Sequence, residues 1–359
     1  MDTLERHHLT AAALQTQRAM LATATVTDHY QRRPQLAERY GPAGRTKCEA
    51  DAAYHLSYLA EAVAVASPAL FVEYLGWVKV LLANLGIPAH DITENLESMR
   101  RAVVQLLPPE LSAVACEYLD AGLQQLPSLP TDLGACIADT TPLGDLAQRY
   151  LQALLDGKRE RARQLVTEAV DRGHDLRDVY LEVFQRTQYE VGRLWQTNRI
   201  SVAQEHYCTA ATQQVMSSLY PRVFSSSKTG RTLVVGCVEG DLHEIGARIV
   251  ADFFEMEGWD TFYLGANTPT SGIVEAVIRH GADVLGISAT MTFHVRAVAD
   301  VVRAVRSSEA CRRVRILVGG YPFNVDPQLW CRVGAEGSAH DARAAVVLAN
   351  RLVDGSPAS

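Results

Sequence analysis

The sequence predicts a multidomain protein in which two helical regions precede an α/β domain with a doubly wound parallel sheet. Residues 1–222 carry apolar side chains at helical spacing over most of their length. From Thr232 onward, short apolar runs alternate with helical patterns, which indicates repeated βα units. A stretch rich in Pro and Ser, Leu126 to Asp132, separates the two helical regions.

Residues 1–130 are expected to form an all-α domain of five or six helices. Ser67 and Pro68 are typical of a helix start, because serine caps and proline fits the first turn. The segment Pro34–Gly44 is expected to be a loop because it contains two prolines and two glycines. Residues 131–142 are expected to be a linker.

Residues 143–225 show four helical patterns with short connections, which predicts an up-down four-helix bundle. Ser201 and Gln204 form a capping-box signature for the last helix. The predicted helices are Leu143–Leu155, Arg159–Asp171, Leu176–Gln196 and Val202–Leu219.

Residues 230–353 are expected to form five parallel strands with alternating helices, a flavodoxin-like fold, and residues 354–359 a polar tail. The predicted strands are Thr232–Val238, Asp260–Leu264, Val284–Ser288, Arg315–Val318 and a weak fifth at Glu336–Ser338.

Composition narrows the function classes. A net charge of −7 over 359 residues argues against nucleic-acid binding. We expect a cytoplasmic protein, because no apolar run reaches membrane-spanning length and no signal peptide is recognisable. The seven cysteines are scattered and contain no CxxC, which indicates reduced thiols. The chain shows no catalytic signature, so we expect a binding protein and not an enzyme, with no catalytic residues.

His243 follows the first predicted strand, at the edge where open α/β sheets bind ligands. Taken alone, it could equally be a core or a surface histidine. Asp241 stands two residues before it, where a carboxylate can fix the tautomer of a metal-binding imidazole. One histidine is too few for a metal site built by protein alone, but it suffices for a metal carried in a macrocycle. Small residues end the neighbouring strands: Ser288, Thr290, Gly319 and Gly320.

The run Asp241-Leu242-His243-Glu244-Ile245-Gly246, followed by Ser288 and then Gly319-Gly320, resembles the DxHxxG…S…GG signature of cobalamin-binding domains. The resemblance implies that His243 is the lower axial ligand of cobalt, with Asp241 as its hydrogen-bond partner. It also implies that the displaced dimethylbenzimidazole enters a slot near Ser288 and Gly319.

The bundle contains Trp195, nine further residues and then Glu205-His206, which resembles the Wx9EH signature of light-sensing adenosylcobalamin proteins. In that family the tryptophan and the Glu-His pair line the upper face of the cofactor. Without the resemblance, Trp195 would be a packing residue and the pair a solvated one. The DNA-binding members have a cobalt-binding histidine after the tryptophan, whereas this chain has Gln196.

The N-terminal domain carries aromatic and polar residues at helical spacing between Arg45 and Leu85. A stripe of this kind most often packs in a hydrophobic core. Its position before a light-type cobalamin module resembles the arrangement of photocobilins, which pair cobalamin with biliverdin in a globin-like or phycobiliprotein-like domain. On that resemblance, biliverdin is a second expected cofactor, although the stripe could be core alone. Its expected contacts are Asp51, Tyr54, His55, Tyr58 and Arg45.

These patterns favour a photoreceptor that holds adenosylcobalamin between the bundle and the α/β domain. We expect no nucleic-acid or membrane partner and a homo-oligomer whose assembly depends on light; the downstream partner is unknown. One alternative is a corrinoid shuttle protein of a methyltransferase system. Another is a regulator that responds to cobalamin concentration without light.

Overall fold

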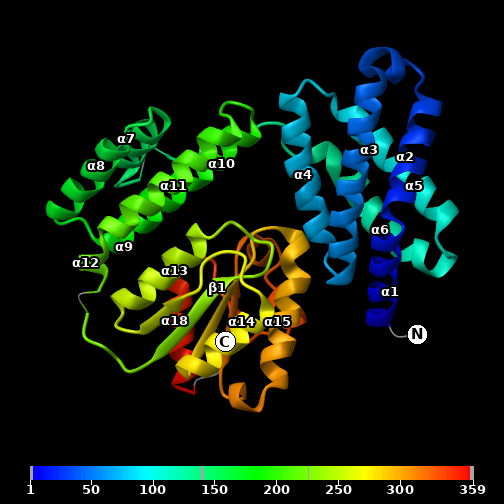
Figure 1. Ribbon diagram of the computed structural model, residues 1–359. Helices are drawn as coiled ribbons and strands as arrows, with labels where there is room; N and C mark the ends of the chain where they lie inside the picture. The colour runs from blue at the N-terminus through cyan, green and yellow to red at the C-terminus, as the bar shows by residue number, and fades with distance from the viewer. Residues whose placement is uncertain (1–2, 139–140, 225, 356–359) are drawn as a thin grey trace. The chain divides into compact units, whose positions relative to one another are not determined.

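The computed structural model describes residues 3–138, 141–224 and 226–355 (Figure 1). The chain forms two compact units. The first comprises residues 1–131 with residues 289–300 and 321–334, and the second comprises residues 132–288, 301–320 and 335–359. Within the described residues, no helix combines the length and the apolar character that crossing a membrane requires.

The N-terminal part of the first unit is all-helical, as predicted. Its helices are α1 (Thr3–Thr16), α2 (Arg18–Arg32), α3 (Gln35–Ala64), α4 (Pro68–Asn84), α5 (Ala89–Leu106) and α6 (Pro109–Gln125), followed by a 3-10 turn, η1 (Leu126–Ser128).

The predicted loop at Pro34–Gly44 is wrong. Helix α3 begins at Gln35 and continues to Ala64, interrupted only by a kink at Gly41, whose φ is 61°. Glycine adopts this left-handed conformation without steric cost. Pro42 then stands in the first turn after the kink, where its missing N–H removes no helical hydrogen bond. Proline and glycine therefore bend the helix here without ending it.

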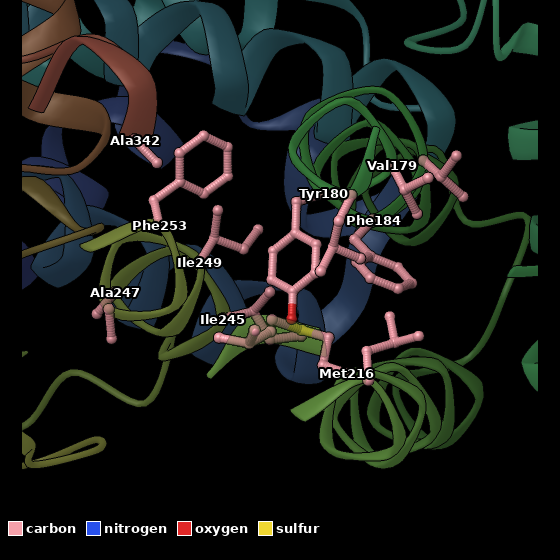
Figure 2. Close-up of a cluster of buried hydrophobic side chains, with 14 of the residues drawn as sticks. Val179, Tyr180, Phe184, Met216, Ile245, Ala247, Ile249, Phe253 and Ala342 are labelled. Carbon is pink, nitrogen blue, oxygen red and sulfur yellow. The ribbon is translucent and has the colours of Figure 1, made fainter. Parts of the chain in front are cut away.

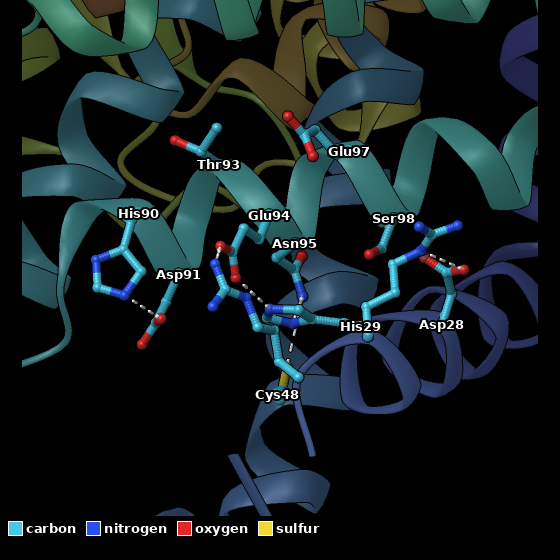
Figure 3. Close-up of polar contacts among 12 residues, drawn as sticks. Asp28, His29, Cys48, His90, Asp91, Thr93, Glu94, Asn95, Glu97 and Ser98 are labelled. Atoms are coloured by element: carbon cyan, nitrogen blue, oxygen red, sulfur yellow. Dashed lines mark hydrogen bonds and ion pairs between the residues drawn. The ribbon is translucent and has the colours of Figure 1, made fainter. Parts of the chain in front are cut away.

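A polar cluster fixes how α2, α3 and α5 pack (Figure 3). His29 and Asn95 are both buried, and their side-chain nitrogens lie 3.4 Å apart. The Asn95 amide also approaches Cys48 Sγ at 3.5 Å, and Glu94 lies 3.8 Å from His29 Nε2. Burial lowers the pKa of His29, so the imidazole is neutral at pH 7.

The second unit contains the helical bundle. Its predicted helix 176–196 is present, but the middle of this helix is a π-helical segment. The Ser201–Gln204 capping box is present as predicted. The elements are α7 (Gly144–Leu155), α8 (Arg159–Asp171), α9 (Leu176–Asp178), the π-helical η2 (Val179–Gln185), α10 (Arg186–Gln196), α11 (Val202–Ser218) and α12 (Tyr220–Val223).

The sheet has five parallel strands in the order β2-β1-β3-β4-β5, which confirms the flavodoxin-like prediction. The strands are β1 (Thr232–Cys237), β2 (Asp260–Tyr263), β3 (Val284–Ser288), β4 (Arg315–Gly319) and β5 (Gly337–Ser338). The helices and turns between and after them are α13 (Ile245–Met256), α14 (Thr270–His280), η3 (Thr292–His294), α15 (Val295–Ser307), η4 (Glu309–Cys311), α16 (Tyr321–Val325), α17 (Leu329–Arg332) and α18 (Ala342–Val353).

The bundle packs on α13 through one apolar cluster (Figure 2). At its centre, the buried Tyr180 hydroxyl donates a hydrogen bond of 2.8 Å to Asp252 Oδ2. This bond satisfies a carboxylate that burial would otherwise penalise. The labelled members of the cluster are Val179, Tyr180, Phe184, Met216, Ile245, Ala247, Ile249, Phe253 and Ala342.

We predict that Asp252 makes stability fall as pH rises from about 4 to 6. Burial raises the pKa of Asp252 from 3.8 to about 6. The unfolded chain therefore loses its proton first, which favours unfolding by up to about 3 kcal/mol once both states have titrated. Asp252→Asn should flatten this slope in urea denaturation at pH 4.5 and 7.

Tyr180→Phe provides the comparison for this prediction. The Tyr180 hydrogen bond lowers the pKa of Asp252, so its removal should steepen the slope while the ring packing remains. A pH dependence that is the same in both variants and in the native chain would contradict the assignment to Asp252.

Candidate functional site

Asp241 and His243 form a fixed pair in the loop between β1 and α13. The Asp241 side chain is fully buried, and its Oδ1 lies 2.9 Å from His243 Nδ1. The same oxygen accepts a hydrogen bond of 3.0 Å from the His243 backbone N–H. The imidazole is 58% exposed, so Nε2 is the nitrogen that can reach a ligand. The hydrogen bond to Asp241 raises the pKa of His243.

Asn267, which the sequence reading overlooked, holds this loop in place. Its side-chain Oδ1 accepts a hydrogen bond of 2.7 Å from Gly240, and its backbone N–H donates to the Asp241 carbonyl at 2.9 Å. Asn267 adopts a φ of 50°, which asparagine tolerates better than most residues. Asn267 lies just after β2, at the same sheet edge as His243, and this position in the sequence could have identified it as a site residue.

The ends of three strands form the floor beside the loop. The register pairs Cys237 with Ser288 and Ser288 with Gly319, so these residues lie in one row at the carboxyl edge. A Cβ added at Gly246 or Gly319 would meet no atom within 4 Å, so the backbone faces open space there. Gly320 follows with a φ of 106°. Thr290 stands two residues beyond β3. Small residues therefore line this edge, with open space at Gly246 and Gly319.

The residues predicted to line the upper face of the cofactor, Trp195, Glu205 and His206, lie at the end of α10 and the start of α11. Trp195 is 38% exposed, and His206 Nδ1 lies 2.5 Å from Glu205 Oε2. The charge of Glu205 adds a smaller contribution to the rise in the pKa of His243 that the hydrogen bond to Asp241 mainly causes. Gln196, in contrast, is buried.

Helix α10 is fixed by a buried ion pair between Arg193 and Glu190, whose side chains are 2.6 Å apart. The Glu190 carboxylate also accepts a hydrogen bond of 2.8 Å from the Cys136 backbone. Arg193 donates to the Leu133 carbonyl at 3.2 Å. The segment predicted as a linker is thus attached to the helix that carries Trp195.

In the first unit, the stripe on α3 meets α4 in an aromatic column. Tyr58 and Tyr74 stack with ring centroids 3.6 Å apart, and His55 Nδ1 lies 2.8 Å from the Tyr74 hydroxyl. Burial lowers the pKa of His55 to about 4, so it is neutral at pH 7. Tyr54 and Asp51 are exposed on the same helix.

Arg45 is not brought together with these residues. Its guanidinium donates to Thr27 at 3.3 Å and stacks over the Tyr30 ring, both on α2. Six residues separate Arg45 from Asp51, and this spacing turns the two side chains to different faces of α3.

Models of known families match three regions of the chain. Residues 231–347 match a B12 binding domain, and residues 146–220 match a second B12 binding domain model. Residues 2–126 match a phycobilisome protein model. These matches agree with the predicted cobalamin-binding signature and with the phycobiliprotein-like N-terminal domain. The fold and the site therefore define a cobalamin-binding protein with an added helical domain.

Relatives narrow this class. A corrinoid protein of Desulfitobacterium hafniense is 28% identical over 58% of this chain and 97% of its own length. Dimethylamine corrinoid protein 1 of Methanosarcina acetivorans is 31% identical over 46% of this chain and 77% of its own length. The chain belongs to the corrinoid protein family. The monomethylamine corrinoid protein of Methanosarcina barkeri shares the fold, with a TM-score of 0.51 at 24% identity, over 58% of this chain and 99% of that one. The relatives are named as corrinoid proteins, which agrees with the prediction of a binding protein.

We predict that Asp241→Ala lowers the pKa of His243, because the hydrogen bond to Asp241 is the main cause of its elevation. NMR titration of the imidazole C–H signals in the cofactor-free chain measures this directly. Asp241→Asn keeps a hydrogen-bond acceptor but loses the charge, so the pKa of His243 in this variant should lie between those of the native chain and Asp241→Ala. An unchanged pKa in the alanine variant would show that the pair does not persist in solution.

Proposed function

We propose that this protein is a light-responsive cobalamin sensor. The observation that carries the proposal is the joining of a phycobilisome-like domain, residues 2–126, to a cobalamin-binding module. The corrinoid protein of Desulfitobacterium hafniense is matched over 97% of its length by 213 residues, so it has no room for a counterpart of this domain. The addition favours a function beyond that of a carrier.

Within this proposal, His243 is the lower axial ligand of the cobalt, and Asp241 fixes the tautomer that leaves Nε2 free. Ser288, Gly319 and Gly320 would accommodate the nucleotide tail along the open edge. Thr290, two residues after Ser288, would also line the path of the nucleotide tail. Adenosylcobalamin would supply a cobalt–carbon bond that light can break.

Above the corrin, Trp195, Glu205 and His206 would shield the upper face. The buried Gln196 cannot replace the histidine that binds cobalt in the DNA-binding photoreceptors, because an amide is a poor cobalt ligand and its side chain is not exposed. The lit state would therefore depend on another group, and the exposed His206 is the nearest candidate along the chain. A change in the packing of the bundle would then alter assembly or partner contact.

The second candidate is a corrinoid carrier of a methyltransferase system. The names of the relatives favour it, because they are corrinoid proteins and two of them are named for dimethylamine or monomethylamine. In this function the same site would hold a methylated corrinoid, and a partner enzyme would exchange the methyl group in the dark. The N-terminal domain would then need a separate role.

We further propose that the N-terminal domain binds a linear tetrapyrrole such as biliverdin. The phycobilisome match and the aromatic column of α3 and α4 support this. Tyr54 and Asp51 are exposed beside the buried His55 and Tyr58, so the column has an accessible edge. Arg45 faces α2 and is not part of the proposed site.

If the protein is a light sensor, illumination should change the oligomeric state of the adenosylcobalamin-loaded protein. Size-exclusion chromatography before and after green light should show a shift in elution volume together with a change in the visible spectrum. Protein loaded with hydroxocobalamin, which has no cobalt–carbon bond to break, is the control and should not shift. A spectral change without any change in elution or in protease sensitivity would favour the carrier.

The tetrapyrrole proposal predicts a red absorption band when the full-length chain is produced with biliverdin. Tyr58→Ala should weaken biliverdin binding by about tenfold, because it removes a stacked ring from the column. Arg45→Ala is the matched control on the same helix and should leave binding unchanged. Equal effects of the two substitutions would place the ligand elsewhere, and no red band would exclude it.

A further inference from the structure

Glu244, the residue after His243, connects two different elements through its side chain. Its Oε1 accepts a hydrogen bond of 2.6 Å from Gln213 Nε2 on α11. Its Oε2 accepts one of 2.9 Å from the Tyr263 hydroxyl at the end of β2. The carboxylate therefore links the bundle, the sheet and the loop that carries His243.

The side chain of Glu244 does not serve its own helix. Glu244 occupies the N-cap position of α13 but makes no capping hydrogen bond with its side chain. The backbone already holds the turn, since Glu244 N–H donates to Leu242 and the Glu244 carbonyl accepts from Arg248. The carboxylate also packs beside Gly265, where an added Cβ would lie in van der Waals contact with Oε2, at 3.4 Å. Helix formation alone thus does not explain the two contacts.

Gln213 lies on the same face of α11 as the predicted cap residue Glu205. The positions Glu205, Thr209 and Gln213 recur every four residues, which is one turn of helix. Thr209 donates a hydrogen bond of 3.1 Å to Glu205 Oε1. One polar face of α11 therefore runs from Glu205 to Gln213, which bonds to Glu244, the residue that follows His243 in the chain.

We propose that Glu244 is a positioning residue that couples the position of α11 to the coordination of cobalt by His243. The inference rests on the proposed ligand role of His243. Because His243 and Glu244 are adjacent, a displacement of α11 that moves Gln213 also moves the imidazole toward or away from the metal. The polar face of α11 then carries the state of the upper pocket to the lower ligand.

Ser217 offers a matched control for this coupling. It lies on α11 one turn beyond Gln213, and its hydroxyl accepts a hydrogen bond of 2.8 Å from Arg248 on α13. The bond joins the same two helices as the Gln213–Glu244 bond and is similarly short. It lies one turn further along α13 from His243, so its loss tests packing between the helices without touching the loop.

The experiment uses the full-length chain labelled with ¹⁵N-histidine and loaded with cob(II)alamin. Electron paramagnetic resonance then shows a two-line nitrogen splitting when a protein histidine binds cobalt, and a three-line splitting when the cofactor's own base does. We expect Gln213→Ala to reduce the two-line fraction and to weaken cob(II)alamin binding by about tenfold. Ser217→Ala should leave both unchanged.

The conservative variant separates positioning from folding. Glu244→Ala should resemble Gln213→Ala, whereas Glu244→Gln should recover most of the two-line signal, because the Gln213 amide can rotate to accept from the new amide. Equal signals in the Gln213 and Ser217 variants would overturn the inference while leaving the ligand assignment intact. Two other results would instead overturn the proposed ligand role of His243. One is the absence of the two-line signal from the native chain, and the other is an equally strong two-line signal in the His243→Ala variant.

Discussion

The packing of the bundle on α13 is the constraint on which the candidate site depends. Helix α13 begins at Ile245, two residues after His243, so whatever fixes α13 also fixes the loop before it. The apolar cluster around Tyr180 and Asp252 joins this helix to η2 and α11. One interface therefore sets the position of both His243, the proposed lower ligand, and the helix that carries Glu205.

Inside the site, a single buried carboxylate, that of Asp241, orients the imidazole of His243. Asp241 is removed from solvent, and burying a charge is costly unless it is paired and hydrogen-bonded. The His243 ring and the His243 backbone N–H are partners of the Asp241 carboxylate, and Asn267 holds the backbone of the same loop. The outcome is one well-oriented imidazole, which suits a metal whose remaining ligands come from a macrocycle.

The first unit extends beyond the N-terminal helices. Residues 289–300, which continue directly from β3, belong to this unit. The buried Glu61 on α3 pairs with Arg296, and Phe293 packs edge-on against Tyr58 of the aromatic column. The segment 289–300 thus packs within the first unit against the aromatic column.

The sequence by itself determined the elements and the local pairs. Hydrophobic periodicity predicted the strands and most helices, and a spacing of two residues sufficed to place Asp241 beside His243. It failed at Pro34–Gly44, because local propensities for turns were outweighed by the packing of a long helix.

Only the tertiary structure decided which distant residues meet. Three contacts join residues from different parts of the chain: Asn267 with Gly240, Gln213 with Glu244, and Arg45 with Thr27 on α2. Their contacts depend on how helices and strands are oriented in space. No local pattern encodes that orientation, because it results from burying the apolar faces of all the elements at once.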